Sequence, residues 1–230
     1  MYLQPQKSDT IRTIKHISPL VLGLFFVSFT HLAFAQSPVA SQEFTVGDYA
    51  EVEVSTSGGR IEVIGKSTTK VTVNAIAYVN GRRSSNANLD NWSITIEEIQ
   101  GKIVAKAEKE SNMGWLRGGN NVSIAFEIET PVNTELNART SGGSVSIKNL
   151  SGNQFARTSG GSMEANNIQG NVELRTSGGA IRLENIEGQA EVATSGGSIR
   201  AKKVTQGLKA RTSGGSLNLQ EISGSLEART

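Results

Sequence analysis

The chain has 230 residues, a formal net charge of +2 at pH 7 and no cysteine. The small net charge gives no general electrostatic reason for binding nucleic acid or an anionic membrane. The lack of cysteine excludes disulfides and cysteine-based catalysis in this chain.

Residues 1–35 have the pattern of a signal peptide. Lys7, Arg12 and Lys15 make its start positive, residues 20–29 are mostly apolar, and Ala33-Phe34-Ala35 fits a small-x-small cleavage site. The apolar run is short for a membrane span. We therefore expect export to the periplasm, the cell surface or the medium, with no membrane insertion after cleavage; an uncleaved anchor is the alternative. Cleavage would leave 20 basic and 20 acidic residues, hence a neutral chain.

Residues 36–135 are predicted to form an irregular β-rich cap. Alternating apolar and polar residues predict strands over 70–78, 92–97, 102–106 and 121–129. Residues 51–64 contain an early, degenerate copy of the repeat described next, with its Thr-Ser-Gly-Gly starting at Thr56. The next copy starts at Thr140, and this separation is not a multiple of the repeat length. The inserted segment is therefore expected to interrupt the register of the repeats.

The tetrapeptide Thr-Ser-Gly-Gly recurs with a constant 18-residue period in the second half of the chain, at Thr140, Thr158, Thr176, Thr194 and Thr212. A fixed short period is the signature of a repeat array. Residues 136–230 are therefore predicted to be a regular β-solenoid. The chain stops at Thr230, where the next copy would begin, so we expect a C-terminally truncated array.

Alternation within each repeat predicts two strands per coil, because side chains along a strand point to opposite faces in turn. The residues five positions after each threonine are apolar: Val145, Met163, Ile181, Ile199 and Leu217. The same alternation puts the threonine itself on the inner side. The Ser-Gly-Gly is expected to turn the chain with glycines at positive φ, so Gly178→Val should destabilise. A sandwich or a propeller is the alternative, although propeller blades need about 40 residues.

These features resemble a known family. The exported β-rich opening, the Glu-Thr-Pro at 129–131 and the Thr-Ser-Gly-Gly-Ser-Ile type of repeat are similar to the DUF4097 family of putative adhesins, which is related to head-GIN-domain, autotransporter-adhesin-like proteins. The resemblance covers nearly all of residues 43–230. It implies a β-helical bacterial envelope protein and no catalytic motif.

The residue types after position 35 exclude several chemistries. His16 and His31 both lie in the predicted leader, so neither Ser-His catalysis nor a typical zinc site is available to the mature chain. The two remaining aspartates, Asp48 and Asp90, lie outside the regular repeats, which excludes repeat-type calcium sites. Carboxylates occur in pairs at 97–98 and 108/110, but neighbouring strand residues point to opposite faces. We predict no catalytic residue, no cofactor and no metal.

One column of basic residues is the candidate ligand face. An arginine lies just before most of the Thr-Ser-Gly-Gly motifs: Arg139, Arg157, Arg175, Arg211 and Arg229. In a stacked array these side chains would form a ladder able to grip the carboxylates of an acidic polysaccharide. The simpler interpretation is that Glu173, Glu191 and Glu227, on the same face, neutralise them.

Two further features accompany the arginine column. Trp115, in a glycine-flanked loop, is either a plug for the cap or a platform on which a sugar stacks. Asn149, Asn167 and Asn185 recur at one corner of the repeat and are expected to form an amide ladder.

Taken together, the sequence predicts an exported, non-enzymatic β-solenoid that serves as an adhesin or an envelope scaffold. The alternative is a carbohydrate-active or acidic-polysaccharide-binding β-helix protein. The expected partners are acidic glycans or other cell-surface components, and the oligomeric state is left open.

Overall fold

The computed structural model describes residues 37–110 and 121–230. The chain separates into two units, residues 1–35 and residues 36–230, and the second holds every described residue. The predicted signal peptide lies outside the described residues. No helix occurs in the described ranges, so the predicted all-β class is confirmed there. Accordingly, none of their segments is a helix capable of crossing a membrane.

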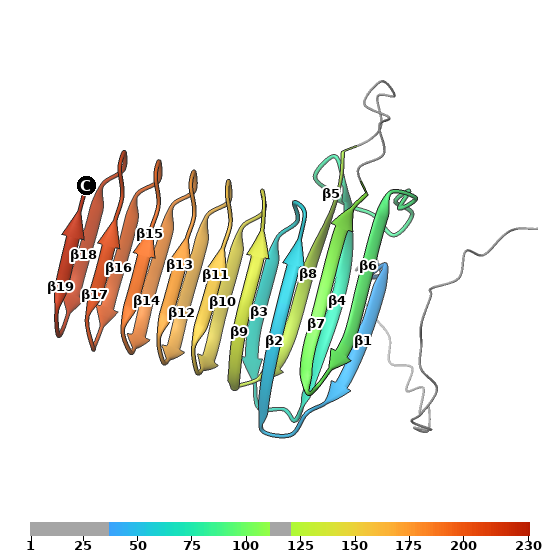
Figure 1. The fold of residues 1–230 in the computed structure, drawn as a ribbon, viewed down its shortest axis with the longest axis horizontal. Helices are drawn as coiled ribbons and strands as arrows, with labels where there is room; N and C mark the ends of the chain where they lie inside the picture. The colour runs from blue at the N-terminus through green and yellow to red at the C-terminus, as the bar shows by residue number, and fades with distance from the viewer. Residues whose placement is uncertain (1–36, 111–120) are drawn as a thin grey trace, which may run out of the picture. The chain divides into compact units, whose positions relative to one another are not determined.

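The first part of the second unit contains the predicted strands and several more (Figure 1). In chain order they are β1 Ala40–Thr45, β2 Tyr49–Thr56, β3 Ile61–Lys66, β4 Lys70–Val79, β5 Arg82–Arg83, β6 Trp92–Ile99, β7 Lys102–Lys109 and β8 Val122–Pro131.

The repeats contribute the remaining strands, one long and one short from each 18-residue period. They are β9 Asn133–Thr140, β10 Val145–Ser151, β11 Gln154–Arg157, β12 Met163–Gln169, β13 Val172–Arg175, β14 Ile181–Glu187, β15 Ala190–Ala193, β16 Ile199–Val204, β17 Leu208–Arg211, β18 Leu217–Ile222 and β19 Leu226–Arg229.

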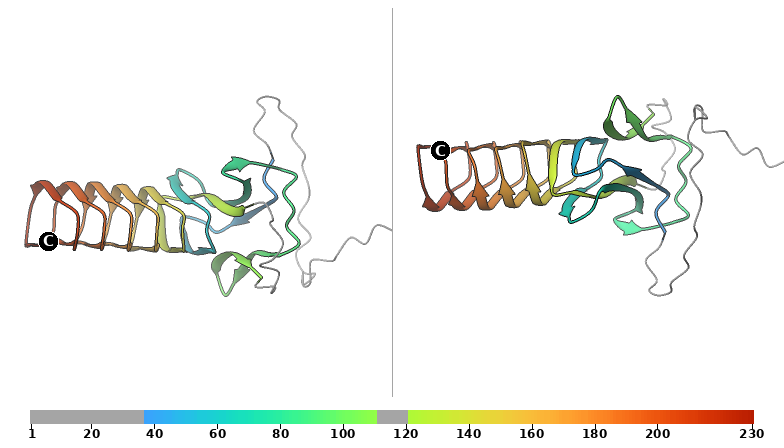
Figure 2. Two further views of the ribbon diagram at one scale, coloured as in Figure 1. Left: turned by 90° about the horizontal axis from the view of Figure 1, so that it is seen from above. Right: turned by 90° about the horizontal axis from the view of Figure 1, so that it is seen from below.

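The strands of the repeats lie in two parallel rows. One row runs β10, β12, β14, β16, β18, and the other runs β9, β11, β13, β15, β17, β19. Each residue pairs with its counterpart in the next repeat, as Val145 does with Met163 and Met163 with Ile181. Viewed along the strands, the chain passes back and forth between the rows (Figure 2). Together the described strands form one large sheet that does not close.

The early copy of the repeat keeps this register. β2 pairs in parallel with β9, so that Thr56 lies opposite Thr140, and β3 pairs with β10, so that Ile61 lies opposite Val145. The expectation that the insertion would interrupt the register is therefore wrong. The inserted strands β7 and β8 instead extend both rows, β7 beside β2 and β8 beside β3.

The core lies between the two rows, where the inner positions of the repeat are almost fully buried. Ile147, Leu174 and Ile181 expose 1% of their surface or less. The repeated threonines are buried as predicted, from 3% exposure at Thr158 to 8% at Thr140. At the far end, Leu226 is 53% exposed because β19 has a paired strand on one side only.

The reason for the Ser-Gly-Gly turn differs from the expected one. None of its glycines in the regular repeats has a positive φ. A Cβ on Gly179 would instead lie 1.9 Å from the carbonyl oxygen of Gly161 in the preceding repeat, whereas a Cβ on Gly178 would meet nothing closer than 3.5 Å. Close stacking of backbones, not a left-handed conformation, therefore requires the second glycine, and the reason given for Gly178→Val was wrong.

The left-handed conformation occurs at another corner of the repeat. Asn149, Asn167, Asn185, Lys203 and Glu221 all have φ between 54° and 59°. The amide ladder predicted there is present, since Asn167 Nδ2 donates to Asn149 Oδ1 at 3.1 Å and Asn185 Nδ2 to Asn167 Oδ1 at 3.0 Å. Asparagine suits this corner because it tolerates the conformation better than most residues do.

Candidate functional site

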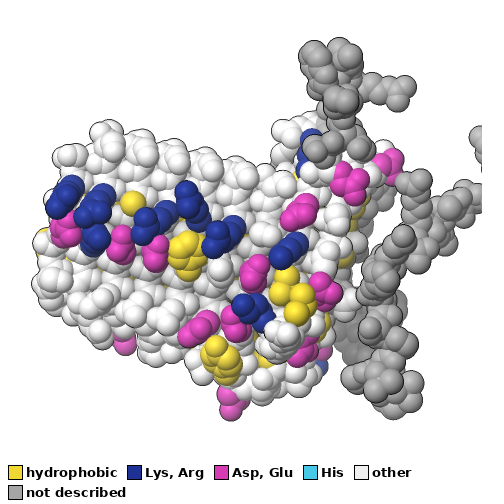
Figure 3. Space-filling view, in the orientation of Figure 1, with side chains coloured by type: hydrophobic (Ala, Val, Ile, Leu, Met, Phe, Trp, Pro, Cys, Tyr) yellow, Lys and Arg dark blue, Asp and Glu magenta, His cyan; other side chains and the backbone are white. Residues whose placement is uncertain are grey.

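The arginines of the predicted ligand face lie in register at the ends of the short strands. Arg157 pairs with Arg139 on one side and with Arg175 on the other, and Arg211 pairs with Arg229. A row of Lys and Arg side chains beside a row of Asp and Glu follows this face (Figure 3). The fold therefore brings four of the five predicted site residues, Arg157, Arg175, Arg211 and Arg229, onto one surface. The fifth, Trp115, lies outside the described residues.

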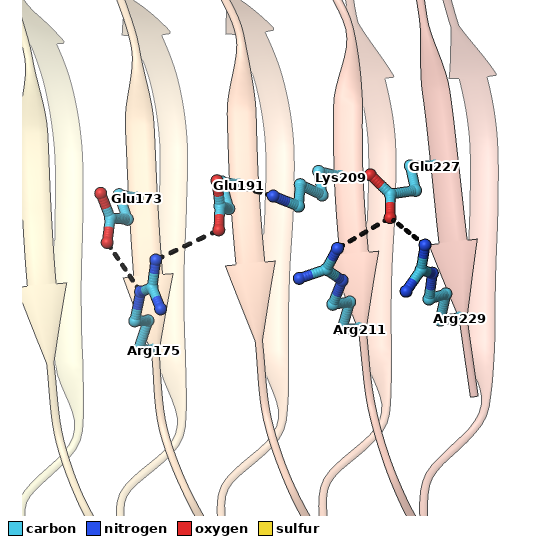
Figure 4. Close-up of polar contacts among 7 residues, drawn as sticks. All are labelled: Glu173, Arg175, Glu191, Lys209, Arg211, Glu227 and Arg229. Atoms are coloured by element: carbon cyan, nitrogen blue, oxygen red, sulfur yellow. Dashed lines mark hydrogen bonds and ion pairs between the residues drawn. The ribbon is translucent and has the colours of Figure 1, made fainter.

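Three of these arginines are held by carboxylates of the same face (Figure 4). Arg175 Nε lies 2.7 Å from Glu173 Oε1, and its terminal nitrogen lies 3.1 Å from Glu191. Glu227 is shared by Arg211 at 2.8 Å and Arg229 at 3.0 Å. The simpler interpretation of the column, neutralisation by neighbouring glutamates, thus describes this part of the row.

The shared carboxylate shows the electrostatic consequence. The hydrogen bond from Arg211, with the charges of Arg211 and Arg229, lowers the pKa of Glu227 below its usual range, although desolvation opposes the shift. Near the insertion, a hydrogen bond to Glu51 raises the pKa of Lys102. Both pairs are exposed at the surface, so they organise side chains more than they stabilise the fold.

The two arginines nearest the insertion are different. Within the described part of the chain, neither Arg139 nor Arg157 has a carboxylate within ion-pair distance. Arg139 Nε donates to Asn137 Oδ1 at 3.2 Å, and its guanidinium carbon lies 5.2 Å from the centre of the Phe155 ring. Arg157 is exposed.

A long groove of about 780 Å³ follows the beginnings of the same short strands. It extends from β2 and β9 to β19. Six glutamates and two lysines line it, together with an amide column of Asn153, Asn171 and Gln189 and the ring of Phe155. Five of the six glutamates, all but Glu135, form ion pairs with a neighbouring lysine or arginine, so the groove offers polar groups rather than a strong negative charge.

The sequence did not reveal this groove. Glu51, Glu53 and Lys102 join it because β2 lies against β9 and β7 lies against β2. The outward amides and glutamates of the repeats were visible as a polar alternation, but that alternation is equally typical of a solvated face. The signal that could have found the groove is the recurrence of asparagine at one position of successive repeats, at Asn153 and Asn171.

The other carboxylates do not form a recognisable centre. Glu97 and Glu98 are exposed on β6, opposite Val104 and Ile103 of β7. Glu108 lines a separate small hollow near Arg139 and Arg157. Within the described ranges, histidine, cysteine, aspartate and glutamate gather nowhere into a group that could hold a metal ion.

Comparison with known proteins adds structural neighbours only. No family model and no curated protein matches the chain. The solved structure of a putative adhesin from Bacteroides fragilis is similar over 83% of this chain and 96% of that one, with 11% identity and a TM-score of 0.45. A putative adhesin from Parabacteroides distasonis covers 82% and 96%, with 15% identity and a TM-score of 0.36.

A putative lipid binding protein from Parabacteroides distasonis covers 85% of this chain and 98% of its own, with 18% identity and a TM-score of 0.32. At these identities and TM-scores, the similarities do not decide what this chain binds.

Proposed function

We propose that the chain is an exported, non-enzymatic β-solenoid that acts as an adhesin or an envelope scaffold. In this interpretation each 18-residue coil supplies two strands, residues 36–135 are a β-rich cap, and residues 1–35 direct export. In both rows, strands of successive repeats pair in parallel, and paired residues occupy the same position of the repeat. This register supports the solenoid. The resemblance of the repeats to the DUF4097 family supports the envelope location.

The long groove is the main structural support for a role in binding. Its lining recurs with the repeat, so successive strands offer similar amides and carboxylates at about the strand spacing of 4.8 Å. A chain-like ligand such as a polysaccharide could lie along it and form similar contacts with each coil. Amide and carboxylate groups in a concave surface are also the partners that sugar hydroxyls require.

The first experiment locates the protein. Intact cells of the source organism are treated with protease while a periplasmic protein serves as the leakage control. Cleavage of this protein alone supports the adhesin role, whereas protection confines it to the periplasm and leaves the scaffold role. Recovery of the uncleaved chain in the cytoplasm would contradict export.

The second experiment tests the groove. Purified protein is applied to an array of neutral and charged glycans, and binding is compared between Gln189→Trp, which fills the groove, and Arg200→Trp, which lies on an exposed position of the other row. Binding lost only in the first variant supports the groove. Turnover of any polysaccharide by the purified chain would contradict the non-enzymatic role and favour the carbohydrate-active alternative.

Binding of acidic polysaccharides is the second candidate, and the arginine column favours it in a restricted form. Three of the five arginines already have carboxylate partners. An acidic ligand would have to displace these glutamates, except at the end of the row where Arg139 and Arg157 lie.

A further inference from the structure

We infer that Arg139 and Arg157 form a binding site for one anionic group, the carboxylate or sulfate of an acidic saccharide. The identity of the ligand as a saccharide rests on the proposed function; the anion site itself rests on the four observations that follow.

The first observation is the missing countercharge. The two guanidinium groups lie on directly paired residues of neighbouring strands, β9 and β11. Like charges facing each other on adjacent strands repel. Elsewhere in the column a glutamate relieves this repulsion, as Glu227 does between Arg211 and Arg229. Among the described residues, no carboxylate lies within ion-pair distance of Arg139 or Arg157, so an external anion can take the place of the glutamate.

The second observation explains why the countercharge is missing. The outward residue two positions before Arg175 and before Arg229 is a glutamate, Glu173 and Glu227. The corresponding residues before Arg139 and Arg157 are Asn137 and Phe155. A third departure, Lys209 before Arg211, is compensated because Glu227 of the next repeat pairs with Arg211. At Asn137 and Phe155 the departures fall in adjacent repeats, and both remove a carboxylate from the same place.

The third observation is that Arg139 is held in position without being neutralised. Its Nε bonds to Asn137 Oδ1 at 3.2 Å, and its guanidinium group lies near the Phe155 ring. The two residues that replace the glutamates therefore orient the guanidinium while leaving its terminal nitrogens available. A positioned arginine loses less conformational freedom when it grips a planar carboxylate or sulfate.

The fourth observation is a hollow of about 290 Å³ beside the two arginines. Hydroxyl groups from three neighbouring strands or turns line it: Ser55, Ser57, Ser141 and Ser159. Ser57 Oγ already accepts a hydrogen bond from the backbone of Lys109, which leaves its own proton free for a ligand. Glu108 also lines the hollow, so two guanidinium groups and one carboxylate leave it positive. Its volume suits one charged sugar unit.

A second pair of arginines provides a matched control. Arg182 and Arg200 are also directly paired on neighbouring strands and exposed, but on the other row. Among the described residues, neither has a side-chain hydrogen bond or a ring contact that positions it. The spacing of the two pairs is the same, but Arg182 has Glu164 as its register partner on the other side. The inference therefore expects binding at Arg139 and Arg157 and not at Arg182 and Arg200.

The test uses the full chain and NMR titration of arginine Nε–H signals with sodium glucuronate, inorganic sulfate and glucose. Glucuronate should shift the signals of Arg139 and Arg157, and glucose should not. Arg139→Gln combined with Arg157→Gln should weaken glucuronate binding about tenfold or more, because charged hydrogen bonds are lost. Arg182→Gln combined with Arg200→Gln should leave it unchanged.

A variant that adds a carboxylate beside the two arginines tests the site more directly than their removal. Phe155→Glu restores the residue type found at Glu173, so the fold should tolerate it, and its carboxylate should occupy the arginines and abolish anion binding. Phe155→Leu removes only the ring and should weaken binding less.

Equal losses from both double arginine variants, or full binding by Phe155→Glu, would overturn the site. Shifts with sulfate but none with glucuronate would overturn the saccharide assignment. The groove is tested separately by Gln189→Trp, so failure of the anion site leaves the proposed function standing, and failure of the groove leaves the anion site standing.

Discussion

The hydroxyl of Thr176 donates a hydrogen bond to the backbone carbonyl of Gly161, in the preceding repeat, at 2.9 Å. The same oxygen accepts from the backbone N–H of Gly179 at 3.3 Å. One buried side chain therefore links its own turn to the turn of the neighbouring repeat. The other regular repeats have the same pair of bonds, which explains why threonine begins every motif.

Thr176→Val should lower the free energy of unfolding by about 1–3 kcal/mol, because it keeps the shape but leaves two backbone groups unpaired. Thr176→Ser keeps the hydroxyl and should cost less. Urea denaturation of both variants measures the difference. Equal stability of the valine variant and the unmodified chain would show that the hydroxyl bonds contribute nothing.

The two glycines of one turn should respond very differently to a methyl group. Gly179→Ala places Cβ 1.9 Å from a backbone oxygen of the preceding repeat, so the two repeats must separate, and we expect the free energy of unfolding to fall by about 3 kcal/mol or more. Gly178→Ala meets only ordinary contacts and should change stability by about 0.5 kcal/mol or less. Thermal unfolding followed by circular dichroism compares the pair. A larger effect at Gly178 would contradict the stacking explanation.

Lys203→Asn should stabilise the protein. Lys203 has a φ of 59°, which is unfavourable for lysine, and it follows three asparagines in the same corner column. The asparagine would relieve this conformation and could extend the ladder from Asn185, for a gain of roughly 0.5–1 kcal/mol. The adjacent exposed Lys202→Asn, in an ordinary strand conformation, is the control and should give no gain. Urea midpoints decide between them.

The lowered pKa of Glu227 predicts a specific pH dependence. Because the folded pKa lies below the unfolded one, the ion pairs with Arg211 and Arg229 stabilise the fold above the usual glutamate range, and this contribution disappears as the pH falls through the lowered pKa.

Carboxyl NMR titration of Glu227 measures this shift. Arg211→Gln should return the pKa towards its usual value, and Arg229→Gln, which acts through its charge alone, should do so less. The distant Arg182→Gln should leave the Glu227 titration unchanged. An unaltered titration in Arg211→Gln would contradict the assigned cause.

The sequence alone determined where the strands of the repeats lie along the chain and which of their side chains face the core. The 18-residue period and the alternation around Val145, Met163 and Ile181 predicted which residues form strands and which side faces the core, because both depend only on spacing along the chain. The asparagine ladder followed from the same period. The positions of four candidate arginines on one face were also predictable, since identical repeats place identical side chains in register.

Only the tertiary structure decided what depends on distance through space. Thr56 lies opposite Thr140 although a long insertion separates them in the sequence, because β2 and β3 add to the two rows while the insertion extends those rows beyond them. That stacking brings Ser55 and Ser57 to Arg139 and Arg157. It also decides which arginines find a carboxylate: ion pairs need distances near 3 Å between side-chain ends, and spacing along a sequence does not specify such distances.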